Sequence, residues 1–145
     1  MPSLSIIILT FNSESFIENC LESVFKFYIK ELTNGEMELL VLDNNSDDQT
    51  VILAKEYFKK KNIYKLSTLS VLENSENVGF GNGLNIGVSK TVSPFVLFIN
   101  PDSQLADSNV MSMLEFIERH KNIGVLGGKI VDGLGKAELS AGRFL

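Results

Sequence analysis

Polar side chains gather directly after four apolar runs of the sequence, and their types can do chemistry. The clusters occupy residues 10–12, 43–48, 74–82 and 100–102. Carboxylates bind divalent cations, and amides can pair with the polar edges of a base or a sugar. Together with helix N-termini, such groups suit a phosphorylated ligand with Mg²⁺ or Mn²⁺ between acid and phosphate.

Asp102 is the carboxylate best placed to bind a metal. Residues 95–99 (FVLFI) are an uninterrupted apolar run, typical of a strand buried on both faces. Pro101 removes a backbone donor and disfavours helix at Asn100, so the chain must turn there. Asp102 would then stand at the carboxyl end of a buried strand, where ligands bind in open α/β sheets. Capping a turn is the alternative role of a single Asp at this position.

Three further runs have the composition of strands. Residues 5–9 and 38–42 are buried-strand runs, and the imperfect alternation of residues 66–72 indicates a strand nearer a sheet edge. Residues 124–131 are expected to form a strand that turns at Asp132-Gly133 and returns from Lys136.

Helical spacing separates these strands. Apolar residues recur at steps of three and four at Ile17, Cys20, Leu21, Val24, Phe25 and Tyr28, at Val51, Ala54 and Phe58, at Leu84 and Val88, and at Val110, Met111, Leu114 and Ile117. Strands that alternate with helices predict parallel βαβ units. We therefore predict an α/β fold, with a Rossmann-like, mostly parallel sheet and helices on both faces.

The carboxyl ends of parallel strands lie along one edge of a sheet, so the four polar clusters should meet there. Helix N-termini on that edge would need only one cap each, which is fewer polar residues than the sequence supplies. Asp43, at the end of an inner strand, is placed to accept hydrogen bonds from a nucleobase or a sugar. The sequence therefore predicts a ligand site on this edge.

Composition excludes several classes of function. The net charge of −5 and the lack of a basic stripe disfavour nucleic acid as a partner. No apolar run approaches the roughly 20 residues of a membrane span, and no basic segment marks a signal peptide. The single cysteine, Cys20, permits no internal disulfide and fits a reducing compartment, so a cytoplasmic location is expected.

Other site motifs are absent from the sequence. Gly79-x-Gly81 is followed by Leu84 where the dinucleotide fingerprint needs glycine, and no Gly-Lys-Ser/Thr phosphate loop occurs. There is no Cys/His set for zinc. His120 is the only histidine, which makes a Ser-His-Asp hydrolase hard to assemble.

Four segments in the same order resemble family 2 glycosyltransferases, most closely their bacterial rhamnosyltransferase-like branch. They are residues 6–12 (IIILTFN), 39–48 (LLVLDNNSDD), 77–87 (NVGFGNGLNIG) and 97–102 (LFINPD). The resemblance implies a GT-A nucleotide-diphosphosugar transferase fold. It also implies inverting sugar transfer from a dTDP- or UDP-sugar donor to a saccharide or lipid-linked acceptor.

The resemblance further implies roles for individual residues. The substrate-binding residues would be Thr10, Phe11, Asn12, Asp43, Asn44, Asn77, Gly79, Asn82 and Asn100. Asp43 would contact the base. Asn100-Pro-Asp102 stands where the family has its Asp-x-Asp motif, so Asp102 would bind Mg²⁺ or Mn²⁺. Asn100 replaces the first Asp of that motif, which leaves the number of metal ligands open.

Family members usually continue well past this length, and their catalytic base lies in the later part. Nothing between Lys129 and Leu145 matches that base, and Glu138 is the only acid of the expected closing strand. Residues 1–145 are therefore expected to be the nucleotide-sugar-binding part of a glycosyltransferase domain, truncated at the C-terminus. The base, and any peripheral contact with the inner face of the membrane, would come from beyond Leu145.

Two other functions remain compatible with the same fold. One is a non-catalytic nucleotide-binding or regulatory module, which would share the site and lack the base. The other is a nucleotidyltransferase, against which the absence of a basic phosphate-binding loop after the first strand counts.

Overall fold

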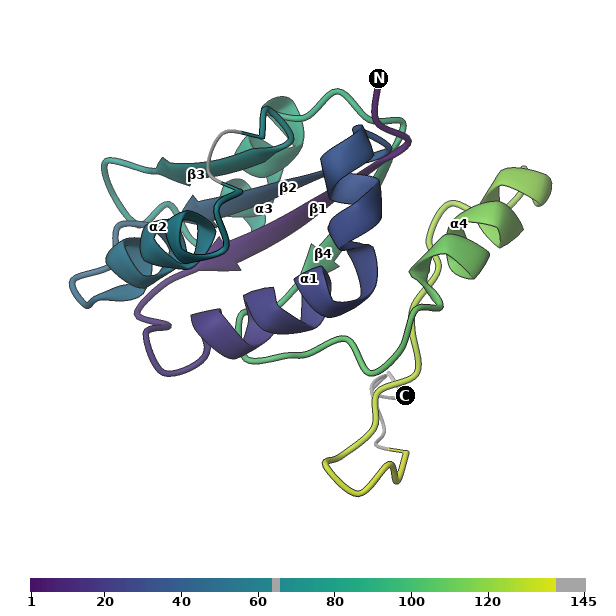
Figure 1. The fold of residues 1–145 in the computed structure, drawn as a ribbon. Helices are drawn as coiled ribbons and strands as arrows, with labels where there is room; N and C mark the ends of the chain where they lie inside the picture. Colours follow the sequence, from purple (N-terminus) through teal and green to yellow (C-terminus); the bar gives the residue numbers. More distant parts are fainter. Residues whose placement is uncertain (64–65, 138–145) are drawn as a thin grey trace, which may run out of the picture. The chain divides into compact units, whose positions relative to one another are not determined.

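The computed structural model describes residues 1–63 and 66–137, and the chain divides into two compact units, Met1–Ser108 and a second that begins at Asn109. The first unit contains a four-stranded parallel sheet in the order β3-β2-β1-β4 (Figure 1). Its strands are β1 (Leu4–Thr10), β2 (Met37–Asp43), β3 (Leu69–Glu73) and β4 (Phe95–Ile99), and its helices are α1 (Ile17–Asn34), α2 (Thr50–Lys60) and α3 (Phe80–Ser89). The second unit contains α4 (Val110–Arg119).

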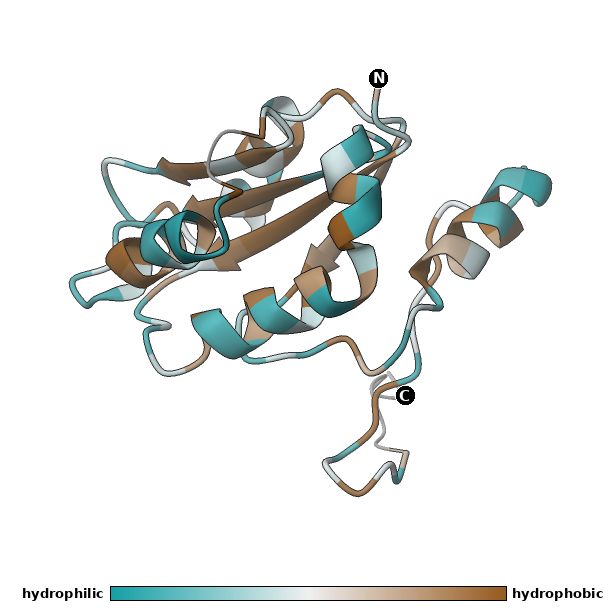
Figure 2. Cartoon of the chain, in the orientation of Figure 1, coloured by the Kyte–Doolittle hydropathy of each residue, from teal (hydrophilic) through white to brown (hydrophobic). Residues whose placement is uncertain are grey.

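Helices cover both faces of the sheet, which explains why the two central strands are apolar at almost every position. In Figure 1, α1 and α2 lie on one face and α3 lies on the other. The apolar strands form a brown layer in Figure 2, and teal residues mark the outer sides of α1 and α2. β1 and β2 are in register along their whole length, from Leu4 opposite Met37 to Thr10 opposite Asp43. The carboxyl ends of the two strands therefore coincide, as predicted.

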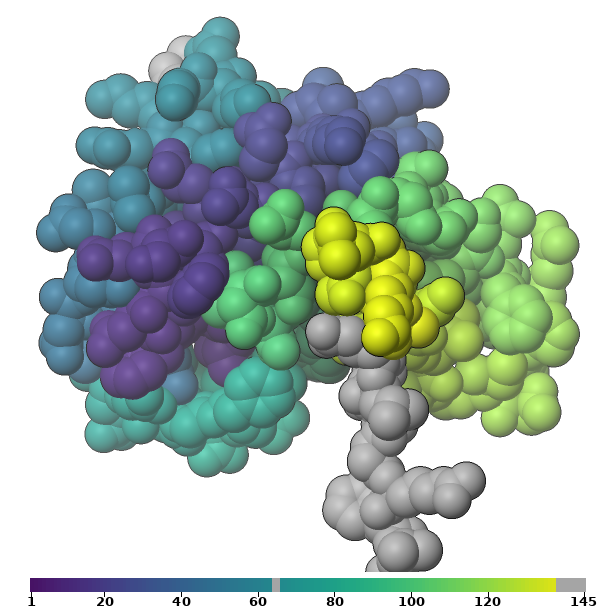
Figure 3. Space-filling view, turned by 90° about the horizontal axis from the view of Figure 1, so that it is seen from below, coloured from purple at the N-terminus to yellow at the C-terminus, as the bar shows by residue number. Residues whose placement is uncertain are grey.

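α3 approaches the sheet closely because it carries glycines on its inner side. Gly83 and Gly87 are buried, and a Cβ added at Gly87 would lie 3.0 Å from Cγ2 of Ile7 in β1. A glycine inside a helix costs about 1 kcal/mol relative to alanine, and close backbone packing explains its presence here. In the space-filling view, purple N-terminal residues and the teal-green residues of the α3 region lie on the same face (Figure 3).

Aromatic rings and two polar contacts to Glu22 hold α1 against α2 and the residue that follows it. The ring of Phe25 lies 5.6 Å from the ring of Tyr57, measured between centroids. The Tyr57 hydroxyl donates to Oε2 of Glu22 at 2.6 Å, and the Lys61 ammonium lies 2.8 Å from the same oxygen. These two hydrogen bonds, first from Lys61 and then from Tyr57, hold the pKa of Glu22 below its ordinary value.

Two strand predictions need correction. β4 is not buried on both faces, since Phe98 is 46% exposed. Within the described residues β4 pairs only with β1 and forms an edge of the sheet. Residues 124–130 form no strand, and only an isolated antiparallel bridge joins Val131 to Ala137 around the turn at Asp132. The rest of the expected return strand, with Glu138, lies outside the described residues.

The strand expected over residues 66–72 lies at the other edge of the sheet, as predicted, but β3 begins only at Leu69 and ends at Glu73. No helix in the described part of the chain has the length and apolar character needed to cross a membrane.

Candidate functional site

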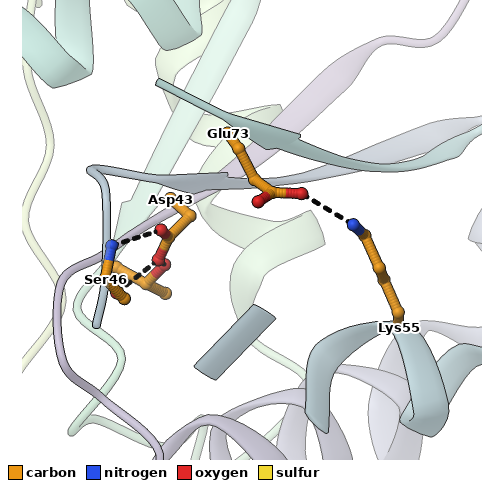
Figure 4. Close-up of polar contacts among 5 residues, drawn as sticks. Asp43, Ser46, Lys55 and Glu73 are labelled. Atoms are coloured by element: carbon orange, nitrogen blue, oxygen red, sulfur yellow. Dashed lines mark hydrogen bonds and ion pairs between the residues drawn. The ribbon is translucent and has the colours of Figure 1, made fainter. Parts of the chain in front are cut away.

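The carboxyl ends of β1 and β2 meet in a buried hydrogen-bond cluster around Asp43. The Thr10 hydroxyl donates to Oδ1 of Asp43 at 2.7 Å, and both residues are buried, with exposed fractions of 0% and 1%. Ser46 donates twice to the same carboxylate, from its backbone N–H to Oδ2 at 2.7 Å and from its hydroxyl to Oδ1 at 2.6 Å (Figure 4). A buried carboxylate needs such donors to offset its lost hydration. The Asp43 side chain thus fixes the turn that follows β2.

An ion pair joins β3 to α2 beside this cluster. Glu73 stands opposite Asp43 in the β2–β3 register, and its Oε1 lies 2.6 Å from the Lys55 ammonium of α2 (Figure 4). Both side chains are more than half exposed, so the ion pair contributes little stability.

Reciprocal hydrogen bonds join the loop after β1 to the loop after β2. The backbone N–H of Asn12 donates to the Ser46 hydroxyl at 2.9 Å, and Oδ1 of Asn12 accepts from the backbone N–H of Asp47 at 2.9 Å. Asn12 has a φ of 48°, in the left-handed region that asparagine tolerates better than most residues. Oδ1 of Asn12 therefore helps to hold the two loops together at this edge.

Asp48 makes the neighbouring part of this loop junction. Its carboxylate accepts hydrogen bonds from the backbone and hydroxyl of Thr50 and, at 3.0 Å, from the backbone N–H of Glu14. Oε2 of Glu14 accepts in turn from the backbone N–H of Gln49 at 2.9 Å. Desolvation by burial raises the pKa of Asp48, but the bonds from Thr50 and Glu14 outweigh it, so the pKa lies below its ordinary value.

Asn44 connects the same edge to the loop before α3. It is 3% exposed, and its Nδ2 donates to Oδ1 of Asn77 at 2.7 Å. The backbone N–H of Gly79 also donates to Oδ1 of Asn77, at 2.9 Å, and Gly79 has a φ of 81°. Asn82, in the first turn of α3, donates from Nδ2 to the carbonyl of Val78 at 3.1 Å. Asn44, Asn77, Gly79 and Asn82 thus belong to one hydrogen-bonded group.

The end of β4 brings Asn100 and Asp102 to the same edge of the sheet. The Asn100 carbonyl accepts from the backbone N–H of Ser103 at 3.0 Å and faces the thiol of Cys20 in α1 at 3.7 Å. Burial, with a further contribution from the charge of Asp102, raises the pKa of the Cys20 thiol to about 12. This thiol is therefore protonated at neutral pH, as expected of a core residue.

Asp102 is the carboxylate at this edge that could bind a divalent metal. The described residues contain no group of three His, Cys, Asp or Glu side chains that could hold a metal by themselves. Asp102 is exposed at the carboxyl edge, and Mg²⁺ commonly takes only one or two protein carboxylates when phosphate oxygens complete its coordination. Within the described residues this edge thus offers Asp102 as a single carboxylate, so a metal bound here would need its other ligands from outside those residues.

The structure places the predicted site residues on one edge but shows that many bond to each other. Phe11, 46% exposed, lies on this edge after β1. Ser46, Asp48 and Asn74 were not among the predicted site residues, although all three make side-chain bonds here. The signal for them was available in part, because the 33-residue offset between β1 and β2 brings residues after Thr10 next to residues after Asp43.

Comparisons with known proteins identify the family. The family model described as Glycosyl transferase family 2 matches residues 5–143. The chain belongs to this family. The four-stranded sheet with helices on both faces is the GT-A arrangement predicted from the sequence.

Several relatives support the assignment. Poly(ribitol-phosphate) beta-N-acetylglucosaminyltransferase TarS from Staphylococcus aureus (strain Mu50) is 30% identical over 136 residues, which are 93% of this chain and 22% of the relative. The putative glycosyltransferase EpsH from Bacillus subtilis (strain 168) is 27% identical over 78% of this chain and 30% of its own length. The chain therefore spans less than a third of either relative.

Solved structures agree with the fold. The crystal structure of S. aureus TarS aligns with a TM-score of 0.66 at 29% identity and covers 83% of this chain and 33% of the TarS chain. A mannosyltransferase from Pyrobaculum calidifontis aligns with a TM-score of 0.67 at 19% identity over 77% of this chain and 30% of its own, and shows the fold alone.

Proposed function

We propose that this chain is the donor-binding part of an enzyme that transfers a sugar from a nucleotide-diphosphosugar to a saccharide or lipid-linked acceptor. The observation that carries the proposal is the meeting of Thr10, Asp43, Asn44 and Asn77 at the carboxyl edge of the parallel sheet, in a member of glycosyl transferase family 2. Ligands of open α/β sheets bind at this edge.

The proposed donor carries uracil or thymine. S. aureus TarS, 28% identical over 83% of this chain with a TM-score of 0.66, has been crystallised with UDP-GlcNAc, which supports a UDP-sugar. The resemblance to the rhamnosyltransferase-like branch supports a dTDP-deoxysugar instead. Oδ2 of Asp43 accepts one protein hydrogen bond, from Ser46, and a carboxylate oxygen can accept a second one from the imide N–H that both bases carry.

The proposed reaction is an inverting displacement. The acceptor hydroxyl would attack the anomeric carbon from the face opposite the leaving nucleotide diphosphate, while a general base removes its proton. That base is expected from a part of the protein outside these residues. Asp102 would hold Mg²⁺ or Mn²⁺, which when bound neutralises charge on the leaving diphosphate.

A cytoplasmic location, at the inner face of the membrane, belongs to the same proposal. The single cysteine, Cys20, suits a reducing compartment. Separating this enzyme from a non-catalytic nucleotide-binding module requires an assay of sugar transfer by the complete protein, because the module would bind the same donors without turnover.

Calorimetric titration with UDP, dTDP and GDP, with and without Mn²⁺, tests the donor site. We expect one uracil- or thymine-containing nucleotide to bind in a Mn²⁺-dependent way, and Asp102→Ala to lose that dependence. Glu56→Ala is the matched control, since it also removes an exposed carboxylate, but one that lies on α2. Equal binding of all three nucleotides, or metal dependence that persists in Asp102→Ala, would contradict the proposal.

A further inference from the structure

The Asn44 side chain uses its complete hydrogen-bonding capacity within the protein. Nδ2 donates to Oδ1 of Asn77 at 2.7 Å and to the carbonyl of Gly79 at 3.4 Å. Oδ1 accepts from Nδ2 of Asn74 at 3.1 Å and from the backbone N–H of Val78 at 3.2 Å. Two donors and two lone pairs are all that a primary amide has, so this buried side chain has no polar group left for a ligand.

Backbone groups fix the orientation of both amides. The N–H of Val78 can only donate and the carbonyl of Gly79 can only accept, so Oδ1 of Asn44 must face the first and Nδ2 the second. The N–H of Gly79 donates to Oδ1 of Asn77 at 2.9 Å, which makes this oxygen the acceptor for Asn44 as well. Asn44 therefore needs its amino group, whereas Asn77 needs only its oxygen.

These bonds tie loop 74–79 to the strand ends beneath it. The backbone N–H of Asn74 donates to the carbonyl of Asp43 at 2.8 Å, and the N–H of Asn44 donates to the carbonyl of Thr10 at 2.8 Å. Asn44 is also bonded covalently to Asp43. A change at the Asn44–Asn77 contact therefore reaches both the start of α3 and the carboxylate that the proposed function places against the base.

We propose that Asn44 and Asn77 are positioning residues of the donor site, which hold loop 74–79 and the start of α3 in place through their contact with each other rather than by touching the nucleotide. The inference rests on the proposed function and revises the direct contacts expected from the sequence. Ligand contact through these amides is the competing explanation, and within the described residues Nδ2 of Asn77 is the one polar atom of the pair that it could use.

The same chemical change at the two positions separates the explanations. Asn77→Asp keeps the acceptor oxygen, so we expect hydrogen-exchange protection of the Gly79 amide and nucleotide affinity within about threefold of wild type. Asn44→Asp puts an oxygen opposite Oδ1 of Asn77, so both should fall about tenfold or more. Asn77→Ala removes the acceptor oxygen, so it should lower Gly79 protection and nucleotide affinity as Asn44→Asp does. Because Asn77 is exposed, this variant should still fold.

Ser75→Asp is the charge control, because it adds a carboxylate to the same exposed loop at a residue with no assigned role. If Asn77→Asp loses as much affinity as Asn77→Ala, beyond the effect of Ser75→Asp, while Gly79 stays protected, Asn77 contacts the ligand and the inference is wrong. If the wild-type chain binds no nucleotide, the proposed function fails. The exchange pattern of the free protein would then still decide the hydrogen-bond roles.

Discussion

Replacement of Asp43 by alanine and by asparagine tests how the carboxyl edge is built. The carboxylate accepts three hydrogen bonds, one from Thr10 and two from Ser46. The Asp43→Asn substitution is isosteric, and the new amide can direct its oxygen to the backbone N–H of Ser46 and its amino group to the two hydroxyls, which can accept as well as donate. Alanine leaves all three donors without this partner.

The expected loss of stability follows from the burial of those donors. The Thr10 hydroxyl is fully buried, and an unpaired buried group costs about 1–3 kcal/mol. Ser46 is only partly buried, so water can replace part of its two bonds to Asp43. The loss that remains for these two bonds is about 1 kcal/mol in total. Asp43→Ala should therefore lower the free energy of unfolding by about 2–4 kcal/mol, and Asp43→Asn by less than about 1 kcal/mol.

Urea unfolding followed by far-ultraviolet circular dichroism measures both changes. With a slope of about 2 kcal/mol per molar urea, the midpoint should fall by about 1–2 M in Asp43→Ala and by less than about 0.5 M in Asp43→Asn. Asp47→Ala, an exposed neighbour in the same loop, is the control. Equal shifts in the two Asp43 variants would refute the reasoning, because they would show that the hydrogen bonds do not distinguish an acceptor-bearing side chain from a methyl group.

Two further predictions concern α3 and pH. Gly87→Ala should lower the free energy of unfolding by about 1–3 kcal/mol, because its Cβ would lie 3.0 Å from a β1 side chain. Gly81 faces open space, so Gly81→Ala should raise the free energy of unfolding by up to about 1 kcal/mol. A higher melting temperature for Gly87→Ala than for Gly81→Ala in differential scanning fluorimetry would contradict the packing of α3. The pKa of Glu22 lies below its ordinary 4.5 in the folded state, through Lys61 and Tyr57, so its contribution to stability is present above the unfolded-state pKa and is lost as pH falls through the folded-state pKa. Urea midpoints should therefore fall less steeply below pH 4.5 in Glu22→Gln than in wild type, by a small amount because the carboxylate is 55% exposed, and identical slopes would contradict the assignment.

The sequence was sufficient for the central strands and the helices, and less so for the edge of the sheet. Runs 5–9 and 38–42 lie within β1 and β2, whose buried faces demand continuous apolar residues. The equally apolar run 95–99 forms β4, but Phe98 is 46% exposed. The apolar composition of a strand shows that its side chains can be buried. Whether they are buried depends on the strands and helices that pack against it, and these come from distant parts of the chain.

The candidate site could be located from the sequence but not resolved into roles. Parallel register alone brings Thr10 to Asp43, so their bond was within reach of a pattern argument. The Asn44–Asn77 bond depends on the path of loop 74–79, which no periodicity describes. Polar residues after a strand can face a ligand or bond to each other, and the sequence pattern alone does not distinguish the two.

This mutual bonding has a functional consequence for the proposed donor site. Loops that were free to move would have to be ordered by the nucleotide, and the entropy lost would weaken binding. Here the loops after β1 and β2 are joined through Asn12 and Asp48, and the loop before α3 is joined through Asn44. Hydrogen bonds within the chain thus largely organise this edge before a ligand binds. A donor nucleotide would bind a preformed surface, so less of its binding free energy would be lost in ordering the loops.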